Sequence, residues 1–381
     1  MAEIWPFPPQ GKVSEALSWQ TDLIRCKAAE QRISLRNLPR TAFDYEYQFT
    51  EGVAEAATLL ARQNMDQDIY LPIWTEGEYV GAIVSSATSI TVDTTNLRYK
   101  AAAHVFIIGD DNTYEIVEIA AVQAGQLDLV SPYVTIGYSR AFIAPCFLCK
   151  MTGPLGIGKS SADYITARAS FQYDKNFGDV GAHSFPVHNS SYVMTDRSVI
   201  AGSQREIQER EVDLFPNIAG PIHYDTKYDY AISKSTVSWS FDTNTEIKAF
   251  REWLFVVKGK QGSFYLPRWT RDFILDVDIG SSDTAITVLA NTDASNAYLG
   301  MICIAMNDGT QYYGEITSWD PQGGGQHVAN LSTSFGSNIL KADVEMITRM
   351  PKMRFDNDTV TFAHLAGQKT TVRMSVMEVP E

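Results

Sequence analysis

The sequence contains two stretches that resemble each other, and this internal repeat constrains the fold more than any other feature. The segment YLPIWT at 70–75 returns as YLPRWT at 265–270. Further matched pairs are Phe49 with Phe241, Ile90 with Ile286, Ile119 with Ile316, and Met151 with Met353. The separation within each pair grows in small steps along the chain and never shrinks. This pattern predicts two diverged copies of one module that differ by small loop insertions.

Composition and charge exclude several classes of protein. Of the 381 residues, 45% are hydrophobic and 20% are charged, which argues for folded cores rather than disorder. The net charge of −14 argues against a nucleic-acid partner, because such a partner requires a basic surface. We find no apolar run long enough to span a membrane and no signal-peptide pattern, so we expect no membrane partner.

The repeat predicts both the fold class and the domain boundaries. We expect a mainly β protein with two tandem diverged copies of a β-sandwich-like module. Each copy should carry one packed helix and an inserted small β-barrel-like subdomain. The first module should span 1–175 with its insert at about 76–140, and the second should span 235–381 with its insert at about 271–343. Residues 176–234 should connect them and begin the second module.

Each copy opens with an alternating strand and then a helix. Residues 43–49 and 235–241 alternate between apolar and polar side chains, which is typical of a half-buried antiparallel strand. In the second copy a capping box formed by Thr243 and Glu246 begins the helix, and Gly259 ends it. Its apolar stripe is Ile247, Phe250, Trp253, Leu254 and Val257. The weaker stripe of the first copy is Val53, Ala56, Ala57 and Leu60.

The rest of each copy reads as short strands. The Leu-Pro-x-Trp segment should be a strand whose proline indicates a sheet edge or a strand start. The inserts should contain strands at 89–92, 105–109, 113–122 and 127–131, and at 284–288, 301–306, 312–319 and 328–333. A closing strand pair should follow in each copy, at 142–151 with 164–173 and at 344–354 with 370–378.

One nucleotide-binding motif is formally present. Residues 153–160 read GPLGIGKS and match the phosphate-binding loop, in which Lys159 would reach the phosphates and Ser160 would hold magnesium. The motif should open an α/β domain, yet β-rich sequence follows it. The corresponding place in the second copy, 353–358, is an ordinary polar turn. We therefore interpret 153–160 as a surface loop and expect no cofactor.

Metal and catalytic patterns are weak. Cys146 and Cys149 form a single C-x-x-C pair, whereas a structural zinc site needs four ligands, and Cys26 and Cys303 are isolated. The histidines do not cluster in the sequence; they are His104, His183, His188, His223, His327 and His364. No G-x-S-x-G nucleophile motif occurs. We expect no metal site, no catalytic residues and no enzymatic activity.

Two further features have a structural interpretation and a functional one. Trp74 and Trp269 occupy matching positions and could bind sugar by stacking, although a repeated tryptophan is more often repeated core. The charged run 205–211, REIQERE, is more typical of a solvated face than of a binding site.

Four short motifs follow one another near the N-terminus: LSWQTD at 17–22, EQR at 30–32, LPR at 38–40 and FDY at 43–45. Their order resembles the start of distal-tail-type proteins of siphophages and gene-transfer agents, which lie at the tip of the tail. The Leu-Pro-x-Trp pattern is similar to a motif of siphophage minor tail proteins. The second copy echoes the first motifs only at Thr195-Asp196 and Gln204-Arg205 and lacks a counterpart of Pro39-Arg40.

The resemblance implies a virion structural protein without catalytic residues. It would belong to the phage tail tip or baseplate, be made in the bacterial cytoplasm, and form a ring or collar linking the tail tube to the hub, tape-measure protein or fibres. Two alternatives remain: a carbohydrate-binding adhesion module of a phage tail, and a P-loop NTPase. Three copies of a two-module chain would present six similar faces, so we expect a homotrimer with pseudo-sixfold character, with a true hexamer as the alternative.

Overall fold

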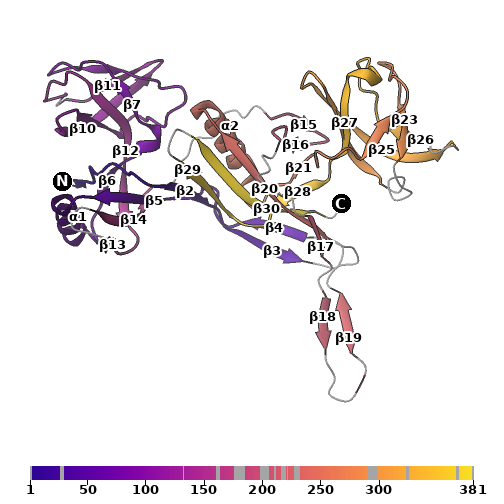
Figure 1. The fold of residues 1–381 in the computed structure, drawn as a ribbon, viewed down its shortest axis with the longest axis horizontal. Helices are drawn as coiled ribbons and strands as arrows, with labels where there is room; N and C mark the ends of the chain where they lie inside the picture. Colours follow the sequence, from indigo (N-terminus) through magenta and orange to yellow (C-terminus); the bar gives the residue numbers. More distant parts are fainter. Residues whose placement is uncertain are drawn as a thin grey trace.

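The computed structural model has an elongated shape and is mainly β (Figure 1). It describes residues 2–25, 30–131, 133–159, 164–175, 185–197, 206–209, 212–215, 220, 222–226, 232–290, 298–322, 326–365 and 369–379. These residues contain two α-helices, α1 (Glu51–Gln63) and α2 (Asn244–Val257), and two short 3₁₀ turns, η1 (Trp74–Glu76) and η3 (Lys341–Asp343). The mainly β class predicted from the sequence is confirmed.

The first half builds one side of a large sheet. Its strands pair in the order β1–β6–β12–β14–β5–β2, and β13 pairs with β14. Their bounds are β1 (Glu3–Ile4), β2 (Val13–Ser18), β5 (Arg40–Phe49), β6 (Ile69–Pro72), β12 (Ala141–Met151), β13 (Gly156–Lys159) and β14 (Ile165–Tyr173). Every second residue of β5 is buried, from Thr41 to Phe49, as the alternation predicts.

Two details of the first half differ from the predictions. In α1 the buried side chains are Ala54, Ala57 and Ala61, so the predicted stripe is right for Ala57 but wrong for Val53, which is exposed. A ridge of alanines contributes little apolar contrast, which explains the error. In addition, β6 is not an edge strand, because it lies between β1 and β12. Pro72 is tolerated because β1 reaches only as far as Tyr70, so no ladder bond needs its missing N–H.

The second half continues the same sheet. Its strands pair in the order β15–β16–β21–β28–β30–β20–β17, with β29 on the other part of β30. Their bounds are β15 (Val187–His188), β16 (Ser191–Val193), β17 (Glu206–Glu209), β20 (Ile232–Phe241), β21 (Phe264–Tyr265), β28 (Lys352–Phe355), β29 (Thr359–His364) and β30 (Thr370–Glu378). The predicted capping box of Thr243 and Glu246 is confirmed. The C-cap is Lys258, and Gly259 follows it with φ +64°.

Each half carries a separate β subdomain with its own core. The first contains β7 (Glu78–Val80), β8 (Ser89–Thr91), β9 (His104–Gly109), β10 (Tyr114–Gln123) and β11 (Gln126–Leu129), and it pairs with β12. The second is a closed barrel of β22 (Phe273–Leu275), β23 (Ala285–Ala290), β24 (Gly300–Met306), β25 (Gln311–Pro321), β26 (Gln326–Leu331) and β27 (Val344–Arg349). The eight predicted insert strands are confirmed.

The predicted single strand 344–354 is wrong. It is two strands, β27 in the barrel and β28 in the main sheet, separated at Met350 and Pro351. The chain changes sheets at this point, and Pro351 cannot donate to either ladder. The other predicted closing pair, β12 with β14, is confirmed over residues 149–151 and 171–173.

Two hairpins were not predicted: β3 (Thr21–Arg25) with β4 (Glu30–Ser34), and β18 (Val212–Phe215) with β19 (His223–Thr226). In Figure 1 the first lies beside the strands of the second half, whereas the second projects away from the body of the molecule. The two halves are joined by β2, which pairs with β5 on one side and with β29 on the other. One core cluster runs through both halves as a result, from Trp5 to Val376.

Candidate functional site

The densest group of buried charges lies where the two halves meet. It contains Glu15 on β2, Glu76 on η1, Arg98 in the first inserted subdomain, Arg251 on α2 and His364 on β29. The side chain of Glu15 is 1% exposed and none of the other four exceeds 9%. Three parts of the fold therefore contribute charged groups to one buried cluster.

The two arginines each bridge both carboxylates. Arg98 Nη1 donates to Glu15 Oε1 at 2.6 Å, and its Nε lies 2.7 Å from Glu76 Oε1. Arg251 Nη2 donates to Glu15 Oε2 at 2.9 Å, and its Nη1 lies 3.2 Å from Glu76 Oε1. His364 Nε2 lies 3.7 Å from Glu15 Oε2. The cluster is thus an ion-pair network of two acids and two bases with a histidine at its margin.

Electrostatics keep this network charged. Burial alone raises the pKa of Glu15, but the guanidinium groups of Arg251 and Arg98 outweigh it and hold that pKa well below its usual range. Burial likewise lowers the pKa of Arg98, and the carboxylates of Glu15 and Glu76 reverse this effect and raise it. Since the two carboxylates and the two guanidinium groups neutralise one another, the network binds charged groups of the first half to charged groups of the second.

Sequence analysis missed this cluster, although two signals were present. Glu15 occupies an inward position of β2 between Val13 and Leu17, where an apolar residue is the rule. Arg251 follows Phe250 on the buried side of α2. A charged side chain in an apolar stripe indicates a buried partner, but the sequence does not say which residue that partner is.

The hairpin β3–β4 makes a second contact between the halves. Arg354 is fully buried and donates from Nε and Nη2 to the Glu30 carboxylate at 2.6 and 3.0 Å. Thr21 donates through its backbone N–H and its hydroxyl to Asp358 at 2.7 and 2.9 Å. Glu30 belongs to the EQR motif, so this motif anchors the first half to the second.

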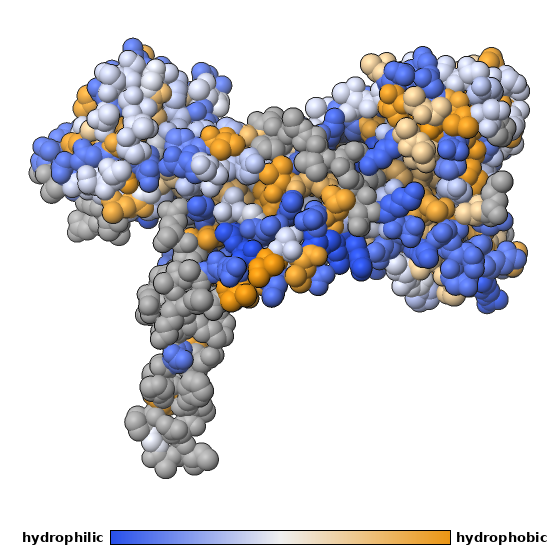
Figure 2. All heavy atoms as spheres, turned by 180° about the vertical axis from the view of Figure 1, so that it is seen from behind, coloured by the Kyte–Doolittle hydropathy of each residue, from blue (hydrophilic) through white to orange (hydrophobic). Residues whose placement is uncertain are grey.

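The outer side of the same hairpin is apolar. Ile24, Ile33 and Leu35 are all more than a third exposed. Figure 2 shows apolar side chains along the lower edge of the middle of the molecule, beside the projecting arm, where Figure 1 draws β3 and β4. Exposed apolar patches of this kind are typical of surfaces that a partner covers.

The segment that matches a phosphate-binding loop does not have the geometry of one. Gly156–Lys159 is the extended strand β13, paired antiparallel with β14 from Gly156↔Arg168 to Lys159↔Ile165. Its amides therefore join a ladder instead of converging on a phosphate. The prediction of a surface position is confirmed, because all four residues are exposed. The prediction of a loop holds for residues 153–155 but is wrong for 156–159, which form a strand. Ser160 lies outside the described residues.

We expect this segment to be inert towards nucleotides. A Lys159→Ala variant should melt at the same temperature as the wild type, with or without magnesium-ATP, in a thermal-shift assay. A ligand at a hundred times its dissociation constant would stabilise the wild type by about 2.7 kcal/mol. A stabilisation of that size that disappears in the variant would contradict the strand interpretation.

The three cysteines that the structure describes are buried in β strands. Burial raises the pKa of the Cys146 and Cys149 thiols on β12, and it raises the pKa of Cys303 on β24 to about 12. They are therefore protonated at neutral pH and poor metal ligands. Cys26 and His183 lie outside the described residues. Within the described part of the chain, no group of three or more His, Cys, Asp or Glu side chains could hold a metal ion.

The other histidines lie in separate places. His104 on β9 contacts Tyr70, with 3.5 Å between Nε2 and the phenol oxygen. His188, His223 and His327 lie on β15, β19 and β26, and only His364 belongs to the charge cluster. The histidines thus do not form a common site with one another.

The paired tryptophans are half-buried rather than central to the core. Trp74 stacks on Phe142 with ring centroids 5.5 Å apart, and Trp269 lies under the guanidinium of Arg197 at 4.9 Å. Trp74, Tyr79 and Phe142 line a cavity of about 430 Å³ that also reaches Arg251 and His364. The prediction of repeated core therefore holds for Trp74 only in part, because it packs against the main cluster from its margin.

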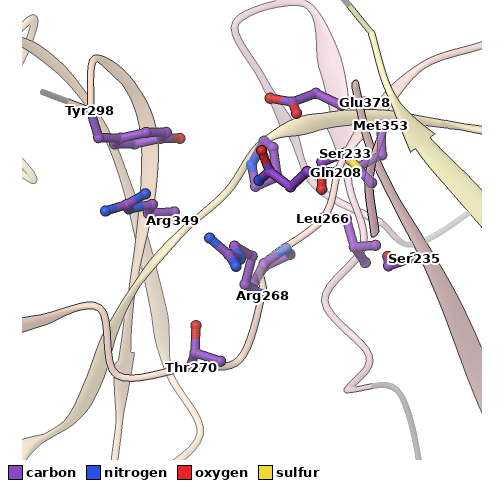
Figure 3. A pocket seen from close by; sticks show the side chains of 12 residues that line it. Gln208, Ser233, Ser235, Leu266, Arg268, Thr270, Tyr298, Arg349, Met353 and Glu378 are labelled. Carbon is purple, nitrogen blue, oxygen red and sulfur yellow. The ribbon is translucent and has the colours of Figure 1, made fainter. Parts of the chain in front are cut away.

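A further cavity, of about 310 Å³, lies between the barrel and the main sheet of the second half. Figure 3 shows Arg349 beside Tyr298 on the barrel side, Arg268 between Arg349 and the main sheet, and Glu378 across the cavity. Arg349 also stacks over the Tyr298 ring at 5.1 Å. Because guanidinium and carboxylate groups both line this cavity, it defines no single ligand chemistry.

Neither helix in the described part of the chain is long and apolar enough to cross a lipid bilayer. No protein-family model matches the chain, and no curated protein matches it.

Proposed function

We propose that this chain is a structural component of the tail tip or baseplate of a long-tailed bacteriophage, where it assembles as a ring or collar that links the tail tube to the hub or fibres. The observation that carries the proposal is the same set of strand pairings in both halves. Two β-sandwich-like modules rigidly joined by a shared sheet and a buried ion-pair network suit a scaffold. The N-terminal motifs supply the resemblance to phage tails.

The main sheets support a duplicated module. Strand β1 runs parallel to β6 with Ile4 opposite Tyr70, and the next amide, of Trp5, donates to the Tyr70 carbonyl at 2.9 Å. Strand β16 runs parallel to β21 with Val193 opposite Tyr265, and the Met194 amide donates to the Tyr265 carbonyl, also at 2.9 Å. Parallel neighbours of this kind are uncommon in an otherwise antiparallel sheet. Their occurrence before both Leu-Pro-x-Trp segments supports common descent.

The inserted subdomains support it too. Strand β10 has a bulge between Ile119 and Ala121, and β25 has one between Ile316 and Ser318. The turn before β10 is closed by Asp111, which accepts from the Thr113 amide at 3.0 Å. The turn before β25 is closed by Asp308, which accepts from the Thr310 amide at 2.8 Å. Bulges are designed features that persist within families.

The proposed partners follow from this duplication. Three chains around an axis would present six similar modules, so we favour a homotrimer in the virion over a true hexamer. The tail tube, hub, tape-measure protein or fibres would contact its faces. The exposed apolar side of β3–β4 and the projecting β18–β19 hairpin are surfaces that such partners could cover, because an isolated two-stranded hairpin is marginally stable alone.

Carbohydrate binding is the second candidate, and the cavity beside Trp74 is the observation that favours it. An aromatic floor next to charged side chains is typical of sugar sites. Binding of the purified protein to a glycan array, lost in Trp74→Ala, would establish it. We expect no such binding, because Trp74 is already stacked on Phe142.

Immunogold labelling of intact particles tests the proposed function. Antibody against this protein should decorate the tail tip in negative-stain images. Label on the capsid alone, or none on particles in which mass spectrometry detects the other tail proteins, would contradict the proposal.

A further inference from the structure

In the part of the chain that the structure describes, two strand edges lack the neighbour that their counterparts have. Strand β2 has β5 on one side and β29 on the other, and β29 in turn has β2 and β30. Within the described residues, β17 pairs only with β20, and β13 pairs only with β14. Open edges of this kind are templates for pairing with another chain.

The registers show which open edge corresponds to which paired one. The matched pair Phe49 of β5 and Phe241 of β20 aligns these two strands. Glu15 of β2 and residue 206 of β17 then stand beside equivalent positions of β5 and β20. Through β14 and β30, the same match places Lys159 of β13 where His364 stands on β29. Strand β17 is therefore the second-half counterpart of β2, and β13 is the first-half counterpart of β29. Strands β2 and β29 are the two strands that join the halves.

We propose that copies of this chain associate head to tail, with β17 of one chain adding antiparallel to the open edge of β13 in the next. This contact would repeat between chains the β2–β29 contact that joins the halves within a chain. The inference rests on the proposed duplication, and it names the partner as a second copy of this chain and the surface as these two edges. It also gives a role to the glycine-rich segment, whose described end is the strand β13.

The expected register follows from the internal contact. Glu15 stands opposite Phe362 in the β2–β29 ladder. The corresponding pair between chains is residue 206 with Ile157, and the next pair is Ile207 with Gly156. These two pairs are the ones that fall within both described strands, because Gln208 and Glu209 lie opposite residues 155 and 154, before β13 begins.

The side chains at these positions leave room for the contact. Ile207 is 45% exposed and would lie opposite Gly156, with Gly158 as its diagonal neighbour. Neither glycine carries a side chain that would obstruct it.

The occupant is a second copy because the chain itself carries both edges at opposite ends of its sheet. A contact between two different surfaces of the same molecule is heterologous and closes into a ring when the rotation permits. Three chains would alternate internal β2–β29 contacts with external β17–β13 contacts, which would give six similar junctions around the axis.

Disulfide trapping tests the contact. An Ile207→Cys variant mixed with a Gly156→Cys variant should form a cross-linked dimer under mild oxidation, because opposed residues of antiparallel strands bring their Cα atoms within disulfide range. Residue 206 with Ile157 provides a second in-register pair. The control mixes Ile207→Cys with Lys159→Cys, whose positions would be about 10 Å apart. The control and the wild type should remain monomeric on non-reducing gels.

The cross-linking is carried out at about 1 mM protein, because this concentration populates even a weak interface. Failure of both in-register pairs to cross-link, or equal cross-linking of the control, overturns the proposal. Gold label at the tail tip without cross-linking would leave the proposed function standing and reject this edge contact. Cross-linking without label at the tail would reject the tail assignment alone.

Discussion

Replacement of Arg251 by methionine should lower the free energy of unfolding by about 3–5 kcal/mol. Methionine keeps most of the volume, but it leaves the buried carboxylates of Glu15 and Glu76 to share the single guanidinium of Arg98. A buried carboxylate without its partner cannot recover its hydration. Urea unfolding followed by tryptophan fluorescence should show a lower transition midpoint.

The matched control is Arg168→Met. Arg168 also pairs with a glutamate, Glu46, but its side chain is 68% exposed. An exposed ion pair contributes about 0–1 kcal/mol, so the midpoint should barely move. Equal effects of the two substitutions would mean that the buried cluster does not hold the halves together.

Trp253→Ala should cost about 3–5 kcal/mol of stability for a different reason. Trp253 is fully buried on α2, with ring centroids 4.9 Å from Phe264, 5.4 Å from Phe250 and 5.6 Å from Phe355. Its removal leaves a cavity among aromatic rings that cannot collapse around it. Thermal unfolding measured by circular dichroism should show a clear fall in midpoint.

Trp269→Ala is the control for that substitution. The Trp269 ring is half-buried and contacts Arg197 from one side, so its loss should cost on the order of 1 kcal/mol. If Trp269→Ala proved as destabilising as Trp253→Ala, the core would not be centred on α2 as described.

Much of the local structure could be predicted from the sequence because it follows from short-range patterns. The alternation in β5, the capping box of Thr243 and Glu246, and the eight insert strands all depend on neighbours in the sequence. The internal repeat added a check on each assignment. The repeat showed that the glycine-rich segment at 153–160 has no counterpart in the second half. The structure places the described end of this segment in strand β13.

The remaining features depend on contacts between distant residues. The Glu30–Arg354 and Glu15–Arg251 pairs join residues from opposite halves of the chain, and no local pattern selects those partners. The hairpin β3–β4 was missed because Asp22 and Gln31 stand among its exposed apolar residues, so no regular alternation marks its strands. The predicted strand 344–354 failed because the sequence does not record that the chain changes sheets at Pro351.

Cryo-electron microscopy of the intact particle tests most directly the central claim that this is a duplicated tail-ring protein. The account predicts three copies of the chain around the tail axis, with their six modules in pseudo-sixfold order and β17 of each copy beside β13 of the next. Six copies around the axis, a single copy, or density for this chain outside the tail would contradict it.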